Sequence, residues 1–100
     1  MTPNQVKYRI HKLYQFLEHG HTFDLRRMRI YRGYIHTHDF PTVVILDYTD
    51  RIIPTLIHEF LHYLHPTWSE TKILKAESAI VCQLTERQIR NILKRLASVL

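Results

Sequence analysis

The sequence predicts a single α+β domain of 100 residues, in which four helical segments accompany a small sheet. A chain of this length can bury one modest core, and its 45% hydrophobic content is typical of a compact globular protein. The run Thr-Val-Val-Ile-Leu at 42–46 is β-branched throughout most of its length, which favours a strand buried on both faces. Three other segments combine N-capping residues with apolar residues at helical spacing.

The first helix begins near the N-terminus. Thr2 is a good N-cap, Pro3 suits the first helical position, and Gln5 completes a capping-box spacing. Apolar residues follow at positions 6, 10, 13 and 17 and form one stripe. Gly20 is the expected stop.

A second strand is predicted from Met28 to Ile35, a segment rich in Ile and Tyr. Arg29 and Arg32 within it suggest a partly exposed or edge position. Residues 36–41 are expected to form the turn that leads to the buried strand at 42–46.

Three more helices follow. One is expected from Ile52 to Leu64, with Pro66 as its stop signal. Ser69 is a suitable N-cap for the next helix. Thr85 and Gln88 have the spacing of a second capping box, so we expect the last helix to follow Thr85.

The chain is basic, with 14 Lys and Arg against 9 Asp and Glu. This charge permits a nucleic-acid partner, and two arginine-rich stretches, 26–32 and 87–95, could serve it, but no nucleic-acid-binding motif accompanies them. The single cysteine, Cys82, excludes an internal disulfide. The sequence has no long apolar stretch and a polar start, so we expect a soluble, cytoplasmic protein without a membrane span.

The most informative segment is His58-Glu59-Phe60-Leu61-His62. Residues four apart lie on one face of a helix, so both imidazoles could ligate one tetrahedral metal ion. Glu59 is placed to act as the general base on a water at that ion. The spacing His-Glu-x-x-His therefore predicts one Zn²⁺ per chain, with His58 and His62 as ligands and Glu59 as the catalytic residue.

The third metal ligand has to come from another element. In an antiparallel hairpin of the two central helices, Glu77 would lie opposite His58 and Glu70 opposite His65. We therefore favour Glu77 as the ligand, expecting it alone to reach both imidazoles, with Glu70 as the alternative. His65 is a further candidate on the same helix face, but seven residues of helix rise about 10 Å, which is too far for one ion.

The stretch from Leu56 to Ala79, with the motif at 58–62, resembles the zincin metallopeptidases of the gluzincin group. The chain length is similar to that of the minigluzincins, whose core resembles the HtpX and CaaX prenyl protease families. The resemblance implies an α+β domain with a small sheet, which we expect to be mostly antiparallel, an N-terminal helix, an active-site helix, a helix with the Glu ligand and a C-terminal helix. It also implies that the C-terminal segment, 85–100, can cover the cleft and keep the protein latent.

The pattern departs from thermolysin-like gluzincins at Val81, where those proteins carry an Asp that orients a zinc-binding His. Asp47 or Asp50 could fix the imidazole instead. Tyr48 and Tyr63 are the candidates for stabilising an oxyanion.

These observations predict a zinc metalloendopeptidase, acting on peptide or protein substrates and isolated as an active enzyme or a latent zymogen. Two alternatives remain at this point: an inactive zinc-binding scaffold, and a small basic nucleic-acid-binding protein. The last helix either packs as an ordinary amphipathic helix or is exchanged with a second chain in a homodimer.

Overall fold

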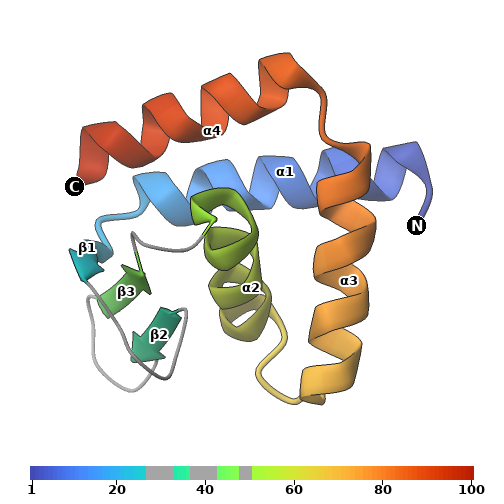
Figure 1. Cartoon of the computed structure of the whole chain (residues 1–100), viewed down its shortest axis with the longest axis horizontal. Helices are drawn as coiled ribbons and strands as arrows, with labels where there is room; N and C mark the ends of the chain where they lie inside the picture. The colour runs from blue at the N-terminus through green and yellow to red at the C-terminus, as the bar shows by residue number, and fades with distance from the viewer. Residues whose placement is uncertain (27–32, 37–42, 48–50) are drawn as a thin grey trace.

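The computed structural model describes residues 1–26, 33–36, 43–47 and 51–100. Four helices and three strands occur in this part of the chain (Figure 1). In chain order they are α1 (Pro3–Glu18), β1 (Thr22–Arg26), β2 (Gly33–His36), β3 (Val43–Asp47), α2 (Ile52–Leu64), α3 (Glu70–Gln83) and α4 (Glu86–Val99).

The helix starts follow the capping signals of the sequence. At α1, the Thr2 side chain accepts a hydrogen bond from the Gln5 backbone, and the Gln5 side chain accepts one from Thr2 in return. Thr85 and Gln88 form the same reciprocal pair at α4. Each box satisfies two backbone donors that a helix leaves unpaired. The predicted helices are therefore confirmed, and the one at 52–64 has the predicted bounds.

The small sheet differs from the expectation. The prediction of a mostly antiparallel sheet is wrong, because the described chain is mainly helical and its short sheet is mixed. The strand order is β1-β3-β2, with β1 parallel and β2 antiparallel to the central β3. Strand order and direction depend on contacts between distant segments, which local residue patterns do not encode.

The unexpected member of the sheet is β1. Its sequence, Thr-Phe-Asp-Leu-Arg, alternates apolar and polar residues over only five positions, which is a weak strand signal. It follows Gly20, whose φ of 75° allows the chain to leave α1 by a turn that other residues resist. Of the strand predicted at 28–35, only residues 33–35 are described, and they belong to β2. The remainder lies outside the described residues.

The core lies where α2 meets the other elements. Phe60 and Leu61 of α2 are 2% and 0% exposed, and Val44 and Leu46 of β3 are fully buried beside them. α1 contacts α2 and α3, and α4 runs alongside α1 (Figure 1). α3 packs on α2, so that α2 is enclosed by helices on one side and by the sheet on the other.

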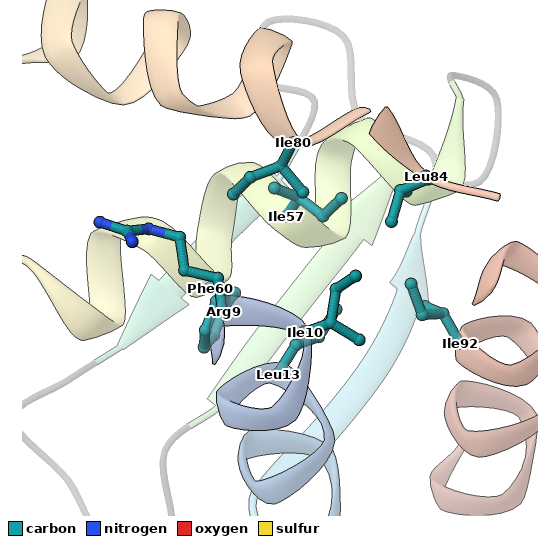
Figure 2. A pocket seen from close by; sticks show the side chains of 8 residues that line it. All are labelled: Arg9, Ile10, Leu13, Ile57, Phe60, Ile80, Leu84 and Ile92. Atoms are coloured by element: carbon teal, nitrogen blue, oxygen red, sulfur yellow. The ribbon is translucent and has the colours of Figure 1, made fainter. Parts of the chain in front are cut away.

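A narrow apolar gap marks the point where the four helices meet. Figure 2 shows its lining, in which Ile57 of α2, Ile80 of α3 and Ile92 of α4 surround side chains of α1. The gap leaves no room for a water molecule. The four helices are therefore in close contact through apolar side chains, as protein interiors require.

Within the described ranges, none of the helices has the length and apolar character required to cross a bilayer.

Replacing Ile92 with Ala should destabilise the protein by about 2–5 kcal/mol, since a fully buried side chain would leave a cavity between four helices. Leu93 is the matched control on the same helix, because its side chain is 43% exposed. Leu93→Ala should change stability by no more than about 0.5 kcal/mol. Urea unfolding measures both, and equal losses in the two variants would contradict the placement of α4.

Candidate metal centre

The helix α2 presents two imidazoles one turn apart. The rings of His58 and His62 have centroids 4.9 Å apart, and their Nε2 atoms are separated by 3.2 Å. The opposite side of α2 is anchored in the core by Leu56 and Phe60. Because this apolar side fixes the rotation of the helix, both imidazoles face α3.

The turn between α2 and α3 determines where α3 begins. The backbone N–H of His65 donates to the Leu61 carbonyl, 2.8 Å away, as α2 ends. The Ser69 hydroxyl then accepts a hydrogen bond from the Lys72 backbone N–H and caps α3. This cap makes Glu70 the first residue of α3. A local capping signal therefore places a carboxylate directly after the turn that joins α2 and α3.

Glu70 contacts both imidazoles. Its Oε1 lies 2.8 Å from His58 Nε2, and its Oε2 lies 3.0 Å from His62 Nε2. The expectation that only Glu77 could reach both histidines is therefore wrong. By its backbone position Glu70 is expected opposite His65, but its long side chain spans the distance from the start of α3 to both rings. That side chain is 58% exposed, so it borders the solvent side of the group.

Glu77 lies opposite His58, as the hairpin geometry predicts, but it contacts the other ring nitrogen. Its Oε1 is 2.9 Å from His58 Nδ1, and its side chain is only 11% exposed. This contact gives His58 an orienting carboxylate. The residues predicted for that role, Asp47 and Asp50, have side chains outside the described residues. A carboxylate on one nitrogen holds the imidazole so that its other nitrogen can serve as a metal ligand.

The arrangement brings several electron-pair donors together. A neutral His58 that donates its Nδ1 proton to Glu77 has a lone pair on Nε2. That lone pair faces the lone pairs of Glu70, and His62 Nε2 adjoins both. These acceptors repel one another unless positive charge lies between them. A proton could remove the repulsion between one pair of acceptor atoms, whereas a single divalent cation would attract the lone pairs of all three side chains.

The donor set fits a metal ion. Among the described residues, His58, His62 and Glu70 form a group in which one ligand atom of each lies within 4.8 Å of the others. Bonds of about 2.1 Å to a tetrahedral zinc would put neighbouring ligand atoms about 3.4 Å apart. The two Nε2 atoms are 3.2 Å apart, and they lie 2.8 and 3.0 Å from the two separate oxygens of Glu70, which is close to this value. Three protein ligands would leave one position for water or substrate.

The other sequence candidates occupy different places. Glu59, the predicted general base, is buried in α2, with 6% of its surface exposed. His65 ends α2, and its ring stacks on Trp68 at 3.6 Å, away from the three-residue group. Tyr63 packs against the rings of Phe16 and His21. Tyr48 lies outside the described residues.

The C-terminal helix does not lie over the group. α4 follows the C-terminal end of α3, whereas Glu70 is at its N-terminal end (Figure 1). α4 buries Ile92 and Leu96 in the core and joins α1 through Arg95, which pairs with Glu18 and covers the Tyr14 ring. This position favours ordinary helix packing over cleft covering. Exchange of α4 with a second chain stays a prediction.

Comparison of the chain with known protein families, with curated proteins and with solved structures finds no match. The resemblance to minigluzincins therefore stays a prediction, and the candidate site is defined by the geometry of His58, His62 and Glu70.

The geometry makes different predictions for the two glutamates. Glu70→Gln should weaken Zn²⁺ binding more than Glu77→Gln, because it removes a ligand. Loss of the Glu77 contact should weaken binding by about 10- to 100-fold, which is typical of a partner that orients a ligand. Isothermal titration calorimetry with a competing chelator measures these affinities.

Glu86→Gln is the matched control, since Glu86 lies on α4 with its side chain 87% exposed. Its zinc affinity should equal that of the native chain. A greater loss from Glu77→Gln than from Glu70→Gln would instead assign the third ligand to Glu77.

Proposed function

We propose that this chain is a zinc-dependent metallopeptidase that hydrolyses peptide bonds. The observation that carries the proposal is the convergence of His58, His62 and Glu70 on one small volume, with Glu77 behind His58. The motif supplies two of these side chains and the general base, and the hairpin of α2 and α3 supplies the carboxylates.

Zinc suits the donor set better than harder cations. Two imidazoles and one carboxylate are ligands of catalytic zinc, whereas magnesium and calcium prefer oxygen ligands. A bound zinc ion would polarise a peptide carbonyl and lower the pKa of a water molecule. The proposal requires one ion per chain.

The remaining chemistry belongs to the side chains. Glu59 accepts a proton from the attacking water and transfers it to the amine that leaves when the C–N bond breaks. Glu77 holds the His58 ring by its Nδ1 atom, 2.9 Å away, so that Nε2 would be available as a metal ligand. Glu70, at the solvent side, would complete the ligand set.

The substrate would be an extended peptide segment. In the described sheet, β1 and β2 are the edge strands, and β2 packs against α2, which carries the motif. A peptide can add to such an edge through backbone hydrogen bonds. Recognition of this kind depends on the main chain and therefore accepts varied sequences.

The burial of Glu59 favours a second candidate. A carboxylate that is 6% exposed is shielded from water, and a group that binds zinc without an accessible base would hold the ion without hydrolysing peptides. On this alternative the chain is an inactive zinc-binding scaffold. The variant Glu59→Gln separates the two candidates.

Glu59→Gln should retain zinc and lose peptide hydrolysis by about 10²- to 10⁴-fold, because the amide cannot accept the proton from water. The assay combines zinc content per chain with cleavage of a library of quenched fluorescent peptides.

The control is again Glu86→Gln, which should cleave at the native rate. Equal cleavage by the native chain and Glu59→Gln would refute the role of Glu59. Zinc binding at one ion per chain, with no cleavage by either protein, would establish the scaffold in place of the peptidase.

A further inference from the structure

A second pocket lies between α1 and α3. It is an open cavity of about 400 Å³, a size at the lower end of the range for small-molecule sites. Lys72, Lys75, Ala76 and Ala79 of α3 form one wall, and α1 forms another. The metal centre uses the other side of α3, since Glu70 and Lys72 are separated by about 200° around the helix.

The charge in this pocket has one sign. Arg9, Lys72 and Lys75 line it, and no described residue of its lining is acidic. Within the described part of the chain, none of these three cations forms an ion pair. Cations gathered without counter-charges repel one another, so an anion in the pocket would relieve an unfavourable arrangement.

Arg9 lines both the apolar gap and this pocket. Its aliphatic stem lines the apolar gap between the helices, and its guanidinium turns away from the isoleucines there (Figure 2). The Arg9 Nε atom is buried and has no hydrogen-bond partner. Because that atom is out of reach of solvent, a ligand in the pocket would meet only the terminal nitrogens of this guanidinium.

One aromatic ring, that of Trp68, forms another part of the same pocket. Trp68 lines it, with the Lys72 ammonium 4.4 Å and the Arg9 guanidinium 5.9 Å from the Trp68 ring centroid. The His65 ring stacks on Trp68, nearly parallel at 6°, and stiffens this wall. Burial lowers the pKa of His65, and the nearby Arg9 and Lys72 lower it further. The wall is therefore flat, rigid and set in a positive field.

We propose that this pocket binds a phosphate monoester attached to a flat ring, of the size of a mononucleotide. The doubly charged phosphate would be held by Arg9, Lys72 and Lys75, which suit phosphate as donors and as point charges. The ring would lie against the small side chains of Ala76 and Ala79, which leave the helix surface open, with Trp68, whose ring stacks on His65, as a further lining residue. The cavity exceeds the needs of inorganic phosphate, and its mixed apolar and cationic lining matches both parts of the ligand.

The site is independent of the proposed peptidase activity. It uses residues of α1 and the opposite face of α3, so loss of zinc ligands leaves its lining intact. The nucleotide is accordingly inferred as a bound ligand and not as a substrate.

The test is a titration of the full chain with AMP by isothermal calorimetry, with Trp68 fluorescence as a second readout because the chain contains one Trp. We expect saturable binding with a Kd below about 1 mM. The double variant Lys72→Gln, Lys75→Gln should bind at least about tenfold more weakly, since it loses two charged donors. Arg9→Met, which retains an apolar stem, should also weaken binding.

Matched controls fix the location. Lys94→Gln, at an exposed position of α4, should bind AMP as the native chain does. The variant His62→Asn at the candidate metal centre should do so too. Inorganic phosphate and adenosine should each bind more weakly than AMP. Absence of saturable binding, native affinity in the double variant, loss of binding in His62→Asn, or equal affinity for AMP and either fragment would overturn the proposal.

Discussion

The two nitrogens of His58 each face a carboxylate, and this arrangement ties the hairpin of α2 and α3 together. Glu77 contacts Nδ1 at 2.9 Å and Glu70 contacts Nε2 at 2.8 Å. Glu70 and Glu77 are seven residues apart, so they lie on one face of α3, two turns from each other. The spacing allows one imidazole to be held from both sides, and it gives the two carboxylates different tasks.

The rest of the fold keeps this pair of helices in register. α2 is held by the core on its apolar side, and the turn at 65–69 is fixed by hydrogen bonds at both helix ends. α1 and α4 pack on the same core, α4 through Ile92 and Leu96. A shift of α3 by one turn would move Glu70 and Glu77 by about 5 Å and separate them from the imidazoles. Packing far from the site therefore sets its geometry.

Helix α3 separates two electrostatic environments. Its face toward α2 carries the carboxylates that meet the histidines, and its face toward α1 carries Lys72 and Lys75. Trp68, just before the helix, joins the basic face through its contact with Lys72. One helix thus supplies acidic groups suited to a cation and basic groups suited to an anion. This division explains how a chain with net charge +5 can still gather three side chains that could hold a cation.

Local sequence determined the helices, because their starts depend on neighbouring residues such as Thr2 with Gln5 and Thr85 with Gln88. It also placed His58 and His62 on one helix face, since four residues make about one turn. The tertiary structure decided what local patterns could not encode. It set β1 parallel to β3, it brought Glu70 to both imidazoles and Glu77 behind one of them, and it joined Arg9 to Trp68 across 59 positions. Each of these contacts depends on how segments that are distant in sequence pack against one another. Burial of the core and the length of the side chains together determine that packing.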